Sequence, residues 1–298
     1  MLLQKMIAVF LAILSFFASY SNKSWGDKYV EGAFPQIGVT EKEKGTVRVC
    51  SFNVRDKDVN DVEMKDRVQL VVRKILEIDP DSFGVQEATA AWMKALVFML
   101  PDYGHIGKDT EGDGTGETNA IFYKRARYKL CGGDTKWLSD TPDETSYGWD
   151  AKCKRLFTYA VLKNRRTGEE YVHVNSHFDH VGQLAREKEA EQIVAFVRDL
   201  LPDRAVVFTA DMNATDSSEA YRTMTSCFAD ARKTAPDSEW VSCTFHGGRS
   251  ELLDDYIIDY VLYNEKVEAK AFRVVTTGID GRFVSDHFPI YADVEIKN

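Results

Sequence analysis

Short strand patterns rich in valine recur along the chain, and both helices and hairpins connect them. Residues 46–54, TVRVCSFNV, alternate as a half-buried strand does. Residues 64–78 carry apolar side chains at helical spacing, and residues 155–178 are typical of a hairpin with NRRTG at its turn. Because strand–helix–strand units and hairpins occur together, the pattern predicts an α/β fold with two mixed sheets packed face to face and helices outside.

The other expected elements follow from the same periodicities. A second helix is expected at 89–100, opened by a capping Thr89, and another at 184–201. A long loop is expected from Tyr103 to Thr118, which carries Gly107, Gly112, Gly114 and Gly116. Further strands are predicted at 81–87, 119–124, 204–214, 257–263, 269–277 and 288–296. Since no linker divides these elements, they predict one domain.

The N-terminus has a different composition from the rest. One lysine precedes an apolar run from Met6 to Ala18, and small residues follow, so residues 1–21 are interpreted as a signal peptide. Residues 22–45 are expected to be an exposed lead-in to a domain at 46–298. This interpretation predicts a secreted or periplasmic protein. A membrane-anchored form is the alternative, because the apolar run is only slightly shorter than a membrane span.

Charge and cysteine content restrict the function classes. The net charge of −9 argues against a large nucleic-acid surface, which usually carries a basic excess. It leaves open a phosphate-processing enzyme, since a bound metal can supply positive charge locally. Five cysteines prevent full pairing within one chain. Cys227 with Cys243 and Cys131 with Cys153 are possible disulfides, whereas Cys50 is expected to be a buried thiol.

Polar residues collect where the predicted strands end. Asp259 is the clearest case, because it interrupts the apolar run IIDYVLY and a buried carboxylate without a partner is costly. Aligned strand ends can meet at one rim of a packed sheet, so these residues are expected to share a pocket. The set comprises Asn53, Glu87, Glu117, His177, Asp179, Asp211, Asn213, Asp259, Asp286 and His287.

The chemistry of this set is coherent, although each member alone has a plainer interpretation. Carboxylate and amide oxygens suit Mg²⁺ or Mn²⁺, and two histidines can donate hydrogen bonds to a phosphoryl group or carry protons. Taken singly, Asn53 could only end a strand, Glu117 could be a solvated acid and His177 could be a core histidine. Likewise Glu87, Asp211 and Asn213 could serve helix starts. The joint pattern favours a metal-assisted phosphoester site.

Seven stretches in this order resemble the endonuclease/exonuclease/phosphatase superfamily, whose fold is that of DNase I. They are SFNVR, GVQEAT, GETNAIFYKR, NSHFDHVG, TADMNAT, IIDYVLY and VSDHFP, and they extend from about Val47 to Glu295. The resemblance implies a four-layer α/β sandwich. It also implies a phosphoric ester hydrolase that depends on Mg²⁺ or Mn²⁺.

The resemblance assigns the metal side and the first histidine residue by residue. Glu87 is similar to the principal metal ligand, with Asn53 beside it and Asp286 as a further carboxylate on the metal side. His177 is similar to the first catalytic histidine of the family. Glu117 is similar to the acid that orients this histidine.

The remaining catalytic positions follow from the same resemblance. Asp211 corresponds to the group that activates the attacking water, and Asn213 to a contact of the phosphate or the nucleophile. His287 is similar to the second catalytic histidine, with Asp259 as its supporting acid. The implied reaction is an in-line attack of the activated water, with both histidines stabilising the phosphoryl group.

A narrower similarity connects residues 136–162 to exported bacterial members of the family. Arg155 and Trp149 lie near the pocket in those proteins, so both are candidates for substrate binding, together with Arg55 and Asp179. Guanidinium groups suit phosphate oxygens. The alternatives are that Arg155 is a surface residue at a hairpin edge and that Trp149 packs a loop onto the sandwich.

These features predict an exported phosphodiesterase or phosphomonoesterase with a small phosphoester as its partner. A nuclease would be expected to carry basic loops, and a sphingomyelinase or phospholipase an aromatic hairpin that docks on a membrane; both are kept as alternatives. A non-catalytic binding module on the same fold is a further alternative. Nucleic acid or a lipid head group therefore stays open as a partner, without stable membrane insertion once the signal is removed.

Overall fold

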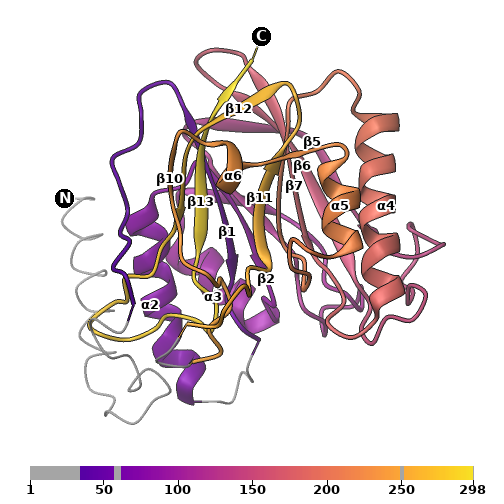
Figure 1. The fold of residues 1–298 in the computed structure, drawn as a ribbon, viewed down its shortest axis with the longest axis horizontal. Helices are drawn as coiled ribbons and strands as arrows, with labels where there is room; N and C mark the ends of the chain where they lie inside the picture. Colours follow the sequence, from indigo (N-terminus) through magenta and orange to yellow (C-terminus); the bar gives the residue numbers. More distant parts are fainter. Residues whose placement is uncertain (1–33, 57–61, 249–251, 298) are drawn as a thin grey trace.

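Two mixed sheets form the centre of the molecule. The computed structural model describes residues 34–56, 62–248 and 252–297, and Figure 1 shows their arrangement. One sheet has the order β10 (Asp237–Glu239), β12 (Val267–Val274), β13 (Ile290–Ile296), β1 (Val47–Asn53), β2 (Ser82–Gln86), β4 (Ile121–Lys124) and β3 (Tyr103–Ile106). The other has the order β5 (Tyr128–Trp137), β6 (Leu156–Asn164), β7 (Glu170–His177), β8 (Val206–Asp211), β11 (Asp259–Tyr263) and β9 (Ala229–Asp230).

Helices cover the two outer faces. The helices α2 (Val62–Ile78) and α3 (Ala90–Met99) lie against the first sheet, and α4 (Gln183–Leu200) and α5 (Glu219–Thr225) against the second (Figure 1). The short α6 (Ala231–Thr234) contacts β11 and β12. The four-layer sandwich predicted from the sequence is therefore confirmed. Every helix that the structure describes is too short or too polar to cross a membrane.

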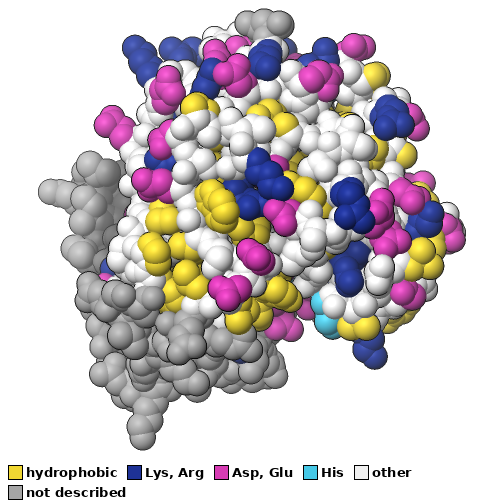
Figure 2. Space-filling model, in the orientation of Figure 1, with side chains coloured by type: hydrophobic (Ala, Val, Ile, Leu, Met, Phe, Trp, Pro, Cys, Tyr) yellow, Lys and Arg dark blue, Asp and Glu magenta, His cyan; other side chains and the backbone are white. Residues whose placement is uncertain are grey.

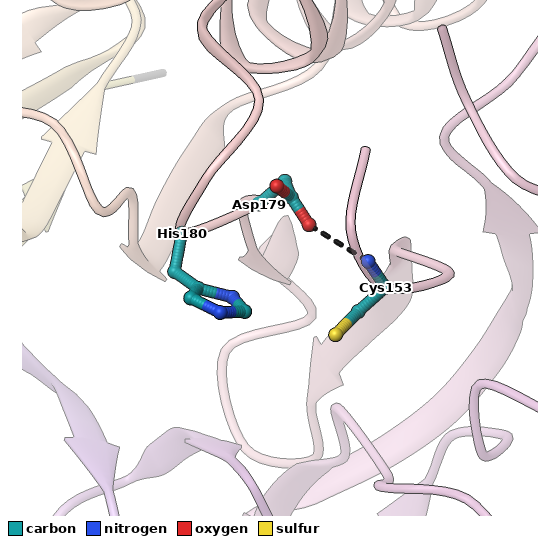
Figure 3. A group of neighbouring side chains, drawn as sticks. All are labelled: Cys153, Asp179 and His180. Atoms are coloured by element: carbon teal, nitrogen blue, oxygen red, sulfur yellow. Dashed lines mark hydrogen bonds between the residues drawn. The ribbon is translucent and has the colours of Figure 1, made fainter. Parts of the chain in front are cut away.

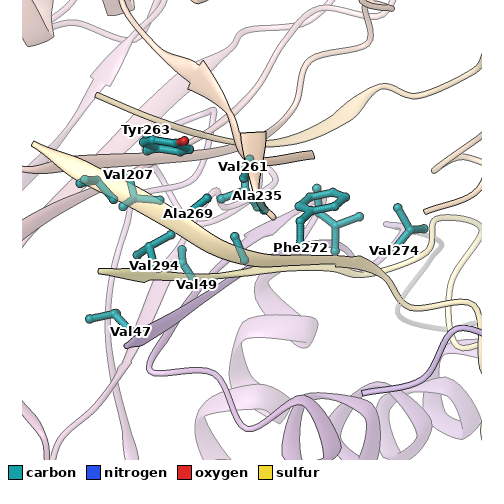
Figure 4. Close-up of a cluster of buried hydrophobic side chains, with 14 of the residues drawn as sticks. Val47, Val49, Val207, Ala235, Val261, Tyr263, Ala269, Phe272, Val274 and Val294 are labelled. Carbon is teal, nitrogen blue, oxygen red and sulfur yellow. The ribbon is translucent and has the colours of Figure 1, made fainter. Parts of the chain in front are cut away.

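Valine is the commonest residue in the core between the sheets, which also contains alanine, isoleucine and aromatic side chains. Val49 of β1 and Val294 of β13 face Val207 of β8 and Val261 of β11 across this layer (Figure 4). Valine fits a pleated strand that is buried on both faces, because its branched side chain packs closely against its neighbours. The two sheets are thereby held as one unit, which fixes the relative positions of their strand ends.

Most predicted elements are present, but β3 and β5 lie in segments for which no strand is predicted. Gly132 and Gly133 interrupt the apolar pattern of β5, and its pairing with β6 shifts between Leu130 and Gly132. Gly133 has φ +157, and a Cβ there would lie 2.4 Å from the carbonyl oxygen of Tyr159. A side chain is thus excluded at Gly133 by the close approach of β6, and the resulting sequence does not resemble a strand.

Two local expectations are corrected. Thr89 is at the N-cap of α3, but its side chain makes no capping hydrogen bond, and its hydroxyl is buried without a partner among the described residues. The segment 34–45 is not uniformly exposed, since Phe34 and Ile37 are buried. Phe34 contacts the rings of Phe283 and Phe288, so it belongs to the domain core. The predicted signal peptide and residues 22–33 lie outside the described residues.

The cysteines are all free thiols in the structure. Neither candidate disulfide is formed, and Cys50 is buried in β1, as expected.

Strand register places the polar residues at one rim. In the second sheet, His177 pairs with Asp211 between parallel β7 and β8, and Asp259 pairs with Asp211 between antiparallel β8 and β11. Adjacent strands lie about 4.8 Å apart, so three functional groups meet side by side. In the first sheet, Asn53 ends β1 beside the end of β2. Ser285 connects the last segment to this rim, because its hydroxyl donates to the carbonyl of Asn53 at 2.7 Å.

Candidate active site

Asp211 is at the centre of the site. Its Oδ2 lies 3.6 Å from Nε2 of His177 and 3.7 Å from Nε2 of His287. The same oxygen accepts a hydrogen bond from Nδ2 of Asn53 at 2.9 Å, and Oδ1 accepts one from the backbone of Asn213 at 2.9 Å. Burial, and then the neighbouring Asp259, raise the pKa of Asp211 above its usual range. Asp211 is therefore a carboxylate with an elevated affinity for a proton.

His287 is paired with Asp259. The ring Nδ1 is 2.9 Å from Oδ2 of Asp259, and both side chains are buried. Burial alone would lower the pKa of His287, but Asp259 and Asp211 outweigh it and raise the pKa well above the ordinary value. The ring of Phe245 covers His287 with 4.9 Å between centroids. This environment favours a charged imidazolium beside Asp211.

Glu87 is held in one orientation by two donors. Nδ2 of Asn53 donates to Oε1 at 2.8 Å, and the backbone N–H of Asp56 donates to Oε2 at 2.8 Å. Glu87 has φ 60 and Asn213 has φ 46, which is a left-handed conformation that residues other than glycine rarely adopt. Strained backbone of this kind is common where a site must fix a side chain, and both residues were selected from the sequence as site residues.

The donor set fits a hard divalent cation. A carboxylate oxygen of Glu87 and one of Asp211 lie within 4.8 Å of each other, whereas the imidazolium form of His287 beside them offers no lone pair to a metal. Repulsion between carboxylates adds to the effect of burial: Glu87 contributes to raising the pKa of Glu117, and Asp259 does so for Asp211. A cation would relieve that repulsion, and oxygen donors are those that Mg²⁺ and Mn²⁺ prefer.

Two members of the predicted metal set are placed differently from Glu87. Asn53 presents its amide nitrogen to the acids, while its oxygen accepts from the backbone of Arg55 at 2.9 Å. Asn53 thus bridges Glu87 and Asp211 as a donor. Asp286 faces Arg55, with 3.5 Å between Oδ2 and Nε. These contacts make Asn53 and Asp286 supporting groups in the structure described.

The structure corrects the expectation that Glu117 orients His177. Nδ1 of His177 is instead 3.0 Å from Nη1 of Arg155, whereas Glu117 lies 3.9 Å from the same guanidinium nitrogen. Burial, followed by repulsion from Glu87, raises the pKa of Glu117 to about 7. Glu117 is therefore a carboxylate on the cavity wall whose direct neighbour is Arg155. The interpretation of Arg155 as an exposed hairpin-edge residue is wrong, because only 4% of its surface is exposed.

Asp179 has no free acceptor position for a substrate. Its Oδ1 accepts from the backbone of Val181 and Gly182, and its Oδ2 from the backbone of Lys152 and Cys153. These four donors use the roughly four lone-pair positions that a carboxylate offers. The predicted contact between Asp179 and the substrate is therefore corrected. Asp179 instead accepts hydrogen bonds that hold the loop at Lys152 and Cys153 to the turn before α4.

The same saturation argues against a second metal site at this place. Atoms of Cys153, Asp179 and His180 lie close enough to share an ion, and Figure 3 shows the Cys153 thiol and the His180 ring reaching toward the same space. Asp179 has its acceptor positions filled, and Nδ1 of His180 already lies 3.3 Å from Arg155. A guanidinium ion beside the ligands would also repel a cation. Cys153 and His180 are therefore better described as parts of the cavity wall.

The acids and histidines open into a cavity of about 410 Å³. Trp149 is half-buried with φ 36 and is not among the residues that line it, so the predicted contact of Trp149 with the substrate is not supported by its position. Arg55 lies behind Asp286. The lining comprises Asp56, Glu87, Glu117, Cys153, Arg155, His177, His180, Asp211, Asn213, Phe245, Tyr256, Ile258, Asp286 and His287.

Several lining residues were not selected from the sequence. His180 stands in the motif NSHFDHVG, so its position beside His177 was a usable signal. Phe245 and Tyr256 form a partly exposed aromatic wall, with 5.8 Å between their centroids. No local pattern distinguishes them from core aromatics, because their position depends on an isolated bridge between Phe245 and His287.

A buried acid behind the site gives a prediction about stability. Glu189 of α4 is fully buried and accepts from the backbone of Asp179 at 3.0 Å, and burial raises its pKa to about 8. Because the folded state holds the proton of Glu189 more tightly than the unfolded state does, the protonated acid stabilises the fold. This stabilisation is complete below the pKa of the unfolded state and is lost as pH rises through about 8. Between pH 5 and 9 the wild type is expected to lose about 3 kcal/mol that Glu189→Gln retains.

Urea unfolding at pH 5, 7 and 9 measures this difference. Glu191→Gln is the matched control, because Glu191 is an exposed acid of the same helix. Parallel pH dependence in the wild type and Glu189→Gln would show that Glu189 is not a buried acid with a raised pKa.

The architecture and the site together define a class of protein. Two mixed sheets flanked by helices match the DNase I-like fold, and in this chain acids, an amide and paired histidines lie at one rim. The chain matches the Endonuclease/Exonuclease/phosphatase family over residues 50–287, and it belongs to that family. Members of this family are phosphoester hydrolases that generally use divalent metal ions.

Three relatives illustrate the similarity. An endonuclease/exonuclease/phosphatase from Bacteroides vulgatus is 34% identical, with a TM-score of 0.81, and the alignment covers 85% of this chain and 100% of that one. The mannosyl-6-phosphatase of Bacteroides thetaiotaomicron is 26% identical, with a TM-score of 0.79, and coverage of 83% and 99%. Nocturnin of Drosophila melanogaster is 26% identical over 177 residues, which are 54% of this chain and 26% of the fly protein.

Proposed function

We propose that the chain is a metal-dependent phosphoester hydrolase whose preferred substrate is a small phosphomonoester, with a sugar phosphate as the first candidate. The observation that carries this proposal is the convergence of His177, His287 and Asp259 on Asp211. Two rings lie within 3.7 Å of one oxygen of Asp211, and Asp259 binds the second ring. The arrangement can take a proton from water and stabilise negative charge in the same small volume.

The metal side of the proposal rests on Glu87. Glu87 would hold Mg²⁺ or Mn²⁺ as the principal carboxylate, because Asn53 and Asp56 already fix both of its oxygens. When bound, the cation would supply positive charge that polarises the phosphoryl group. Asp286 lines this side with Arg55 3.5 Å from its carboxylate, and it would limit how far the substrate can move.

Two residues divide the proton chemistry. Asp211 would accept the proton of the attacking water at Oδ2, since burial and Asp259 increase its proton affinity. His287 would stay charged because Asp259 stabilises the imidazolium, and its Nε2–H would donate to a phosphoryl oxygen. The side-chain amide of Asn213 lies 3.0 Å from Nε2 of His177 and would help to orient the ring of His177.

Cavity size and surface charge favour a small substrate over nucleic acid. A volume of about 410 Å³ suits one phosphorylated small molecule. On the face shown in Figure 2, basic and acidic side chains are interspersed, and the net charge is −9. The similarity to a protein named mannosyl-6-phosphatase supports a sugar phosphate as the first substrate to test.

The experiment is a substrate and metal screen with the purified chain. We expect hydrolysis of sugar phosphates with Mg²⁺ or Mn²⁺, and a loss of at least about a hundredfold in EDTA, restored by excess metal. Phosphate release is measured against panels of sugar phosphates, inositol phosphates, phospholipids and single- and double-stranded nucleic acid.

Each other outcome of the screen has a definite meaning. Turnover that persists in EDTA contradicts the metal-dependent mechanism. A preference for DNA or RNA supports the nuclease alternative, and cleavage of sphingomyelin or phospholipid supports the lipid alternative. Metal binding without turnover on any phosphoester supports a binding module.

We also propose that the chain is exported and belongs to the exported bacterial subgroup of the family. The support is the apolar run from Met6 to Ala18 and the small residues after it. Expression with a C-terminal tag, followed by cell fractionation and N-terminal sequencing, tests this proposal. A mature protein that begins near residue 22 in the periplasm or medium is expected. An uncleaved chain in the membrane fraction would favour the anchored alternative.

A further inference from the structure

Arg155 lies beneath two histidine rings in the wall of the cavity. Its Nη1 is 3.0 Å from Nδ1 of His177, and its Nη2 is 3.3 Å from Nδ1 of His180. Only 4% of Arg155 is exposed, whereas His180 is exposed. Arg155, His177 and His180 all line the same cavity. The guanidinium of Arg155 therefore contacts the Nδ1 atom of each of these two histidines.

The chemistry of guanidinium fixes the direction of both hydrogen bonds. Arginine has five N–H donors and no acceptor, and it is not deprotonated in proteins. The Nδ1 atoms that face it must therefore act as acceptors and carry no proton. A neutral imidazole has one protonated nitrogen, so in both rings the proton is on Nε2. Both rings then offer an Nε2–H donor on the side away from Arg155.

Asn213 does not overturn this assignment. Its Nδ2 lies 3.0 Å from Nε2 of His177, where an amide N–H would compete for the same nitrogen. The same Nδ2 donates to the carbonyl of Phe178 at 3.0 Å, so the amide keeps a hydrogen-bond partner when Nε2 of His177 carries the proton, whereas the guanidinium cannot accept. Oδ2 of Asp211, 3.6 Å away, provides a further acceptor for the ring proton. Arg155 is the partner that cannot adapt, so it determines the tautomer.

The carboxylates around Arg155 hold it without replacing the rings as its partners. Its Nε lies 3.8 Å from Oδ2 of Asp179 and has no hydrogen-bond partner among the described residues, and Glu117 lies 3.9 Å from Nη1. Burial, and then Arg155, keep the pKa of His177 well below its ordinary value, which agrees with a neutral ring. The rings of His177 and His180 are thus the two hydrogen-bonded partners of the guanidinium.

We propose that Arg155 is a positioning residue that fixes His177 and His180 as a pair of Nε2–H donors facing the cavity, and that His180 binds phosphoryl oxygens of the substrate. The second part rests on the proposed function, while the first stands on geometry alone. His180 thereby becomes a binding residue that complements the charged His287 on the other side of Asp211. Arg155 itself acts through the rings and not by touching the phosphate.

The tautomers are tested by ¹⁵N NMR of the full chain labelled at histidine, with Mg²⁺ present, at pH 8. Signals are assigned with the variants His177→Gln and His180→Gln. We expect the wild type to show protonated Nε2 and unprotonated Nδ1 for both rings. Arg155→Gln, whose amide can accept a hydrogen bond, is expected to admit the Nδ1–H tautomer. Arg155→Lys should retain the wild-type tautomer for at least one ring.

Two results would overturn the first part of the proposal. One is a protonated Nδ1 on either ring of the wild type. The other is an Arg155→Gln spectrum in which both tautomers are unchanged. If Arg155→Gln does not fold, the wild-type spectrum and Arg155→Lys still decide the question, because each gives the tautomer directly.

The binding role of His180 is tested with inorganic phosphate and with the hydrolysed phosphoester. His180→Leu removes the donor and is expected to weaken phosphate binding and raise KM about tenfold, as for one lost hydrogen bond to a charged group. We expect kcat to change less than about twofold, since Arg155 is the hydrogen-bond partner of the His180 ring and the proton transfer is assigned to Asp211. His180→Gln, which retains an N–H, should recover most of the affinity.

The outcomes separate this inference from the proposed function. Phosphate binding by His180→Leu that equals the wild type overturns the binding role even when the chain hydrolyses phosphoesters. Absence of turnover on every phosphoester, with both tautomers and phosphate binding as expected, overturns the proposed function and leaves the arrangement around Arg155 intact.

Discussion

Replacing Asp211 by asparagine is expected to lower kcat at least about a thousandfold, because the substitution removes the proton acceptor and keeps the shape of the side chain. The backbone of Asn213 donates to Oδ1 and Asn53 donates to Oδ2, so the one oxygen that asparagine retains keeps one of these two hydrogen bonds. Stability should change in the opposite direction. Burial and Asp259 raise the pKa of Asp211, so its ionised form opposes folding, and the metal-free variant should be more stable than the wild type at pH 8.

Steady-state kinetics with saturating metal and thermal unfolding in EDTA measure the two effects. Asp230→Asn is the matched control, since Asp230 is a buried acid of the same sheet that pairs with Arg232. It should keep kcat, and because burial also raises the pKa of Asp230, a stability gain from removing a buried charge is expected in both variants, whereas the loss of kcat is expected only in Asp211→Asn. Retention of more than about a tenth of wild-type kcat in Asp211→Asn would sink the role assigned to this residue.

Asp259→Asn is expected to lower kcat by about a hundredfold to ten-thousandfold, as when the acid that orients a catalytic histidine is neutralised. Asp259 is the strongest cause that raises the pKa of His287, and burial acts against it. Without Asp259, His287 should lose its proton at lower pH. The alkaline limb of the kcat profile is therefore expected to move to lower pH, with the residual activity highest in acid.

The sign of the stability effect follows from the same linkage. A histidine with a raised pKa stabilises the fold fully below its unfolded pKa, and this contribution disappears as pH rises through the raised value. Asp259→Asn should thus cost stability most at pH 6 and least in alkali. Thr244→Val is a neighbouring control that removes a hydroxyl accepting from the backbone of Asp259 but leaves the carboxylate. An alkaline limb that stays in place in Asp259→Asn contradicts the pairing with His287.

The part of the site that the sequence predicts is the part that strand register determines. His177, Asp211 and Asp259 each stand at the end of a regular strand, and regular pairing brings them together. Arg155 is the last residue of the loop before β6, and its contact with His177 depends on the path of that loop. The periodicity of the sequence carries no information about this path. Glu117 therefore lines the cavity as expected, but its direct neighbour is Arg155 and not the histidine that it is predicted to orient.

The direction of a polar group is harder to predict than its presence. Asn53 is found at the expected strand end, but only the structure shows that its nitrogen faces both acids. The strand β5 was missed for a related reason, since Gly133 is required by the approach of Tyr159 and not by any local preference. Sequence periodicity reports burial along one element, whereas these features report contacts between elements distant in the chain.

Phe34 anchors the segment before β1 in the domain core, so the point at which the chain is truncated affects the packing near the site. Its ring contacts Phe288, the residue that follows His287, and Phe288 also packs on His246. An expression boundary at residue 46 would remove Phe34 and its packing on Phe288, the neighbour of His287 in the chain. Proteolytic maturation is under the same restriction: cleavage before Phe34 keeps this packing, and cleavage after it would weaken the support of His287.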